Sequence, residues 1–173
     1  LAAAIAHVYI FGKLIQSLFG LNISEGFFRG VTRMVYGVTA FGLLFAITGT
    51  LLGGIWANES WGRFWGWDPK ENGALLICIW MLMMLHARYT GYVKGLGFSI
   101  AAIFLGMIVV WSWWGVNLLN VGLHTYGFES GIALIVRLVY VYGWAVMGLG
   151  GLAWLLHRVT ATAAQPPAAP PAP

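Results

Sequence analysis

The sequence predicts an all-α fold: a polytopic bundle of about five transmembrane helices with an external, tryptophan-rich loop. Hydrophobic residues make up 60% of the chain and charged residues only 8%, whereas soluble domains carry about 25% charged residues. The apolar runs also reach the length of about 20 residues that a bilayer-crossing helix needs. We therefore expect an integral membrane protein whose surroundings are the lipid bilayer. The expected spans cover residues 1–20, 31–56, 70–89, 98–116 and 132–156.

The basic residues indicate how the chain is oriented. The net charge is +4, but the nine Lys and Arg residues are dispersed at the ends of apolar runs. This pattern is typical of membrane topology and not of phosphate binding, so we expect no nucleic-acid partner. Five spans leave six basic residues on the side opposite the tryptophan-rich stretch. The positive-inside rule then predicts a multi-pass protein of the cell inner (plasma) membrane with that stretch on the extracytoplasmic side.

Two further features bear on domain organisation. We expect one integral membrane domain over residues 1–158, followed by a disordered tail over 159–173, because that segment is rich in Ala and Pro and cannot build a core. The chain lacks an initial Met and starts inside an apolar run, so we expect a fragment that begins part-way along a helix. It contains no CxxC or CxxCH, which excludes a thiol oxidoreductase and a c-type cytochrome.

The stretch between the second and third spans carries the most specific pattern. Four tryptophans lie between residues 56 and 67, with glycines, charges and Pro69 among or after them. Asp68 before Pro69 predicts the N-cap and first turn of the third span. At the end of a membrane bundle, such a segment forms an aromatic surface suited to a large planar ligand. The alternative is an interfacial belt of tryptophans, which is common in membrane proteins.

Two of the four histidines are candidate ligands. His86 lies within the third span, about 27 Å along the helix from Asp68, and an ionisable group there is a functional-site hypothesis. The alternative is a histidine that snorkels to the interface. His124 lies in the polar loop after the fourth span, and Gly122 beside it lets the backbone approach a ligand closely. Its alternative is a solvated loop histidine. His7 is expected to be packed or hydrogen-bonded within the first span.

An aromatic surface beside an accessible histidine is what a haem pocket requires. Imidazole binds the iron axially, and apolar or aromatic faces cover the porphyrin. The two haem propionates need cations, and Arg63 and Lys70 are the nearest candidates. The alternative for both cations is a local network with acidic neighbours such as Asp68 and Glu71.

Residues 61–71, Trp-Gly-Arg-Phe-Trp-Gly-Trp-Asp-Pro-Lys-Glu, closely resemble the WWD signature of the haem-handling proteins of cytochrome c biogenesis. The other matching motifs resemble the CcsA/ResC branch of that family, and they occur in the family's order and spacing. The haem-delivery CcmC and haem-lyase CcmF branches fit these segments less well. The additional motifs are Gly54–Glu59, Leu85–Arg88, Gly115–Leu119 and Gly122–Gly127.

The resemblance implies roles for individual residues. His124 matches an external axial ligand to haem iron, and His86 matches a transmembrane histidine that holds haem on its way outward. The haem-presenting surface matches Trp61, Trp65, Trp67 and Asp68. The family also has an external histidine before the WWD segment. His7 lies too deep in its span to match it, so we expect that ligand upstream of this fragment.

The resemblance also implies a function. The expected protein is a membrane subunit of a cytochrome c synthetase, which carries haem b outward and presents it to apocytochrome c for thioether attachment at CxxCH. No catalytic side chain is expected, since the apocytochrome's own cysteines are the nucleophiles. A ResB-type membrane protein is the expected partner. Two alternatives remain open: a CcmC-like haem transporter that does not catalyse attachment, and a structural membrane subunit without haem.

Overall fold

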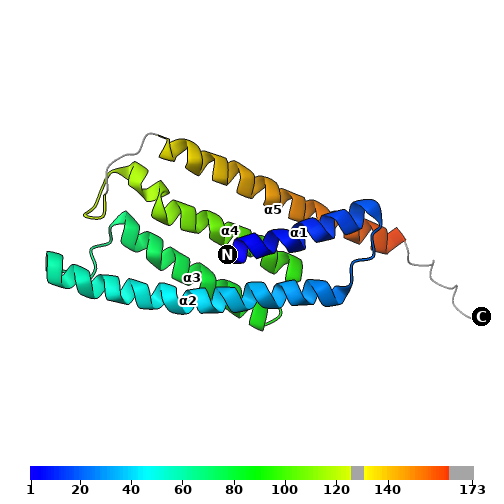
Figure 1. The fold of residues 1–173 in the computed structure, drawn as a ribbon, viewed down its shortest axis with the longest axis horizontal. Helices are drawn as coiled ribbons and strands as arrows, with labels where there is room; N and C mark the ends of the chain where they lie inside the picture. Colours follow the sequence, from blue (N-terminus) through cyan, green and yellow to red (C-terminus); the bar gives the residue numbers. More distant parts are fainter. Residues whose placement is uncertain (126–130, 164–173) are drawn as a thin grey trace, which may run out of the picture.

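A computed structural model describes residues 1–125 and 131–163 (Figure 1). Within these residues the chain forms five α-helices and one 3-10 helix, and each α-helix contains a segment long and apolar enough to cross a membrane. The predicted all-α transmembrane bundle is thereby confirmed. The helices are α1 (Ala2–Phe19), α2 (Glu25–Trp61), α3 (Pro69–Tyr89), α4 (Gly95–Trp113), η1 (Gly115–Leu119) and α5 (Ile132–Ala163).

The helices run side by side in alternating directions, and α4 lies at the centre of the bundle (Figure 1). In its membrane-spanning window 44% of the residues are buried, against 17–22% for the other four helices. α4 packs against α1, α2, α3 and α5, which explains why its apolar residues are distributed all round and not along one stripe. The core contains the fully buried side chains Phe98, Ala102, Ile10, Phe28 and Val35.

α2 is longer than the span predicted for it. Residues 25–30, which precede the expected span of 31–56, form its first turns, and Ser24 caps the helix by accepting a hydrogen bond from the backbone N–H of Phe27. The helix ends at Gly62, whose φ of +70° is a left-handed conformation that suits glycine. The tryptophan-rich stretch is therefore only partly a loop, since Trp56 and Trp61 belong to α2.

Two ends of the bundle can be distinguished. The Trp-rich end consists of residues 56–70 and 113–125, where α2 and α4 end and α3 begins. The basic end, opposite it, contains the connections after α1 and α3, and there Lys13 pairs with Glu25 at 2.7 Å. His86 lies in the last turn of α3, at the basic end.

The end of the chain is described only in part. α5 continues through Ala163, so the first five residues of the expected tail, 159–163, are helical. Residues 164–173 lie outside the described residues, as do residues 126–130 with the last two positions of the Gly122–Gly127 motif.

Candidate functional site

The loop from residue 62 to residue 68 is held by a capping box at the start of α3. Asp68 is the N-cap, and its Oδ1 atom accepts hydrogen bonds from the backbone N–H groups of Lys70 (2.9 Å) and Glu71 (3.0 Å). In return, Oε2 of Glu71 accepts from the N–H groups of Gly66 (2.6 Å) and Asp68 (3.3 Å). This reciprocal pattern satisfies the donors that a helix start leaves unpaired. The Glu71 side chain therefore connects the middle of the loop, at Gly66, to the start of α3.

The second oxygen of Asp68 reaches a residue 56 positions away. Oδ2 forms a short hydrogen bond with Nδ1 of His124, and the Asp68 side chain is only 4% exposed. Burial raises the pKa of the Asp68 carboxyl, but hydrogen bonds from His124 and from the backbone N–H groups of Glu71 and Lys70 outweigh it, so the net pKa is lowered. The lowered pKa favours the ionised carboxylate, in which both oxygens are hydrogen-bond acceptors.

Two further contacts fix the position of His124. The imidazole lies edge-to-face against the indole of Trp61, with ring centroids 4.7 Å apart and an interplanar angle of 84°. Gly122 has a φ of +91°, and a Cβ added there would lie 2.7 Å from Cβ of Asp68. Only glycine lets this backbone pass so close to Asp68. His124 is consequently a partly buried, held side chain and not a freely solvated loop histidine.

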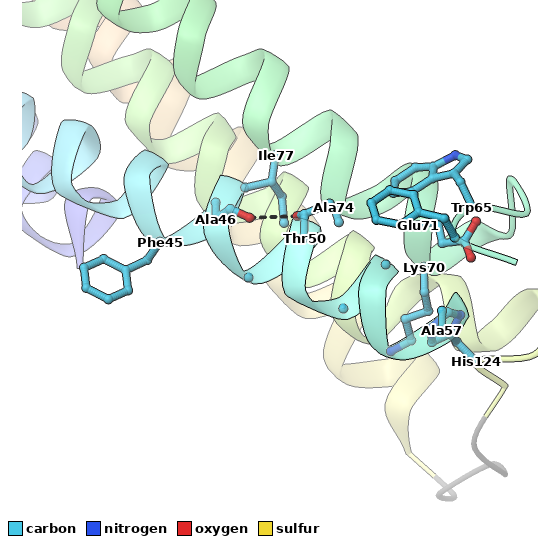
Figure 2. Close-up of a pocket in the computed structure, with 14 residues that line it drawn as sticks. Phe45, Ala46, Thr50, Ala57, Trp65, Lys70, Glu71, Ala74, Ile77 and His124 are labelled. Carbon is cyan, nitrogen blue, oxygen red and sulfur yellow. Dashed lines mark hydrogen bonds between the residues drawn. The ribbon is translucent and has the colours of Figure 1, made fainter. Parts of the chain in front are cut away.

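A cleft of about 360 Å³ lies between α2 and α3 and reaches the Trp-rich end. Its volume is within the range of small-molecule and cofactor sites. Figure 2 shows Phe45 and Trp65 at its opposite ends, and His124 beside Ala57 near the Trp-rich end. The α2 wall consists largely of small residues, and a Cβ added at Gly49 or Gly53 would meet no atom within 4 Å. The full lining is Phe45, Ala46, Gly49, Thr50, Gly53, Gly54, Ala57, Phe64, Trp65, Lys70, Glu71, Ala74, Ile77 and His124.

The cleft brings together only some of the site residues predicted from the sequence. Trp65, Lys70 and His124 line it, whereas Trp61 and Asp68 lie behind His124 and contact its ring.

The other two loop residues lie outside the cleft lining. Trp67 is 68% exposed and has a left-handed φ of +59°. The side chain of Arg63 packs against Gly66, where there is no room for a Cβ.

Two residues of the cleft lining, Lys70 and Trp65, carry N–H groups that differ in their hydrogen-bond partners. The Nζ atom of Lys70 donates a short hydrogen bond to the carbonyl of Trp113. The indole N–H of Trp65 is buried, and no partner for it exists among the described residues. A buried donor without a partner costs free energy unless a ligand or water accepts its hydrogen bond.

His86 is not part of this cleft. Its side chain is exposed on the last turn of α3, where its Nδ1 lies 2.8 Å from the carbonyl of Leu82 in the same helix. The two predicted haem ligands therefore lie near opposite ends of α3, since His124 contacts Asp68 at its start and His86 lies in its last turn.

The cleft itself was not predicted. The small residues of α2 were visible in the sequence, but they indicated only close helix packing. The structural role of Glu71 was also missed, although Asp68 followed three residues later by Glu71 is a capping-box pattern.

The arrangement fits haem better than a lone metal ion. The potential ligand atoms of Asp68, Glu71 and His124 all lie within 4.8 Å of one another, but both carboxylates already accept backbone hydrogen bonds. Nδ1 of His124 is bound to a carboxylate, so Nε2 is the nitrogen of this ring that could bind a metal. This is the usual arrangement around metal-bound histidines. An apolar cleft and a cation are further features of the kind that a haem site uses.

Comparison with known proteins agrees with this chemistry. The family described as cytochrome c assembly protein matches residues 1–124. The chain belongs to this family. Membership supports a role in cytochrome c maturation.

Individual relatives point to one branch of the family. The chain is 40% identical over 102 residues to a cytochrome c biogenesis protein CcsA of Lotus japonicus, 42% over 93 residues to that of Spinacia oleracea, and 43% over 93 residues to that of Helianthus annuus. These alignments include 58%, 53% and 53% of the chain, but only 31%, 28% and 29% of the relatives. The predicted resemblance to the CcsA type is confirmed for a partial chain. No solved structure matches.

Proposed function

We propose that this chain holds haem b at the Trp-rich end and presents it to apocytochrome c for thioether attachment. The observation that carries the proposal is the pairing of His124 with Asp68 at the end of an apolar cleft. That pairing leaves Nε2 of His124 as the nitrogen for the haem iron. The lining supplies an apolar surface for the porphyrin, and Lys70 supplies a cation for a polar group at its edge.

The proposed chemistry needs positioning and no nucleophile from this chain. Each apocytochrome cysteine adds its S–H across a haem vinyl group, with sulfur on one carbon and hydrogen on the other, so no oxidant is consumed. Holding both reactants in place converts a bimolecular step into an effectively unimolecular one, which lowers the barrier by several kcal/mol in favourable cases. The exposed Trp67 and the partly buried Trp61 extend the aromatic surface around the haem edge.

We also propose a route for haem and a partner protein. His86 binds haem at the basic end before it moves outward, and a ResB-type membrane protein completes the assembly. The Trp-rich end faces away from the cytoplasm, because six of the nine basic residues lie at the other end. Arg63 acts as a second cation near the propionates.

Replacement of His124 by Ala tests this function. Haem content of the purified protein should fall by about 10-fold or more, since the proposed axial ligand is lost together with its hydrogen bond to Asp68, and cytochrome c maturation should fall with it. The control is His7→Phe, which keeps a ring against Tyr142 in α5. Unchanged haem absorbance and unchanged maturation in His124→Ala would refute the assignment.

A second experiment separates the proposal from its alternatives. Covalent haem attachment is measured in a reconstituted system with and without this chain. Attachment that proceeds equally without it, given free haem, would favour a transporter that only delivers haem. A purified chain that shows no haem absorbance at all would favour a structural subunit.

A further inference from the structure

The carboxylate of Asp68 has two tasks that are divided between its two oxygens. Oδ1 accepts the backbone N–H groups of Lys70 and Glu71 and so starts α3. Oδ2 takes no part in that cap and faces only Nδ1 of His124 among the contacts described. A carboxylate can serve both because it is an acceptor at every lone pair.

This division determines which nitrogen of His124 carries the proton. An ionised carboxylate only accepts, so Nδ1 must be the donor in the neutral imidazole, and Nε2 is left with its lone pair. The lone pair is what a metal ligand must offer. The tautomer of His124 is therefore set by Asp68 before any ligand binds.

We infer that Asp68 is a positioning residue that selects the ligating tautomer of His124, and that it acts on haem through this histidine and not by touching it. This inference rests on the proposed function for its consequence, haem retention, but its first step concerns the haem-free protein. It differs from the role that the family resemblance implied, in which Asp68 belonged to the haem-presenting surface. Asp68 is absent from the cleft lining, whereas His124 is part of it.

The surroundings restrict both side chains. The Asp68 side chain is buried, Gly122 passes close to its Cβ, and Trp61 packs edge-to-face against the His124 ring. Glu71 ties the N–H of Asp68 itself to the start of α3. Contacts within the protein thus fix the position of His124 relative to the Asp68 carboxylate, and no ligand is needed for this.

Replacement of Asp68 by Asn separates the two tasks. Asparagine is as good an N-cap as aspartate, so its amide oxygen keeps the cap and its NH₂ group turns toward His124. Nδ1 must then accept a hydrogen bond, and the proton moves to Nε2. Loss of the correct histidine tautomer after an Asp→Asn change is established for the serine-protease triad.

The first measurement uses the full chain in detergent without haem, with ¹⁵N-labelled histidine. At about pH 8, above the ordinary histidine pKa, the nitrogen shifts of His124 should report a proton on Nδ1 in the native chain and on Nε2 in Asp68→Asn. The His124→Ala spectrum identifies the His124 signals. An unchanged tautomer in Asp68→Asn would overturn the inference, whatever haem does.

The second measurement is haem affinity in a double-mutant cycle. Asp68→Asn should weaken haem binding by about 10-fold, the lower end of what such partner changes cost, and should have no further effect in the His124→Ala background. An equal loss with and without His124 would show a purely structural role and overturn the inference. Glu25→Gln at the basic end is the control, since it also removes an ion-paired carboxylate from a first helical turn. If His124→Ala retains haem fully, the proposed function fails while the tautomer result stands.

Discussion

The histidines at the two ends of the bundle have different surroundings. At the Trp-rich end, His124 is 23% exposed, bound to Asp68 and packed against Trp61. At the basic end, His86 is exposed and its Nδ1 lies against the carbonyl of Leu82, one turn earlier in α3. Both rings direct Nε2 away from their anchor, but only His124 stands at the end of an apolar cleft.

This difference shows how much of each site the chain supplies by itself. The Trp-rich end combines an oriented imidazole with a cleft that is lined by α2, α3 and the loop before α3. At the basic end, the chain supplies an imidazole on a helix surface. We therefore expect haem binding at the Trp-rich end to depend on fine geometry, and haem binding at the basic end to depend on a second protein.

Replacement of Gly122 by Ala should have the largest effect on the comparison. Its φ of +91° and the approach to Asp68 both exclude a Cβ, so the His124 loop must shift, and haem occupancy should fall by about 10-fold or more. The control is Gly20→Ala at the basic end, which shares a positive φ (+65°) but has no atom within 4 Å. For each variant, haem absorbance per protein measures haem occupancy, and thermal unfolding measures stability. Equal haem loss in the two variants would mean that general destabilisation is responsible.

Replacement of Gly53 by Leu should have an intermediate effect, because it fills the cleft from the α2 side. Overpacking costs about 1–3 kcal/mol, which corresponds to a loss of haem affinity of about 5-fold or more. Gly37→Leu lies on the same helix, also has no atom within 4 Å of its added Cβ, and is not part of the cleft lining. Titration of haem into the two variants compares them directly. Matching affinities would place the porphyrin outside this cleft.

Replacement of His86 by Ala should have the smallest effect on haem added to the purified chain. We expect the affinity to stay within about twofold, as for most exposed substitutions, because His86 lies at the far end of α3 from the cleft. The haem that co-purifies from cells should nevertheless fall, since the proposed entry step is lost. A large loss of affinity for added haem would contradict the independence of the two ends.

Much of this architecture could be predicted because long apolar runs and cap residues are local signals. Asp68 before Pro69 predicted the start of α3 correctly, and the five spans followed from hydropathy. The first turns of α2 were missed, since residues 25–29 are polar enough to resemble a surface segment. In that case the Ser24 cap decided the boundary, not hydropathy.

The candidate site was harder to predict because its contacts join distant segments. The sequence marked His124 and Asp68 separately, but a hydrogen bond across 56 residues has no local signature. Arg63 and Lys70 were equivalent as cations by sequence, and the fold separated them: Lys70 lines the cleft, while Arg63 packs on Gly66. The cleft depends on the distance between two helix axes, which no residue pattern specifies.

The glycines of α2 that line the cleft have a consequence for any measurement of haem affinity. Gly49 and Gly53 are exposed and lie within a helix long and apolar enough to cross the bilayer, so the cleft borders the region of acyl chains. We expect hydrocarbon tails to occupy this space when haem is absent, so that the proposed binding of haem would have to displace them. Apparent affinity becomes a competition constant that depends on the shape of the surrounding amphiphile, so variants can be ranked only in one detergent or one lipid.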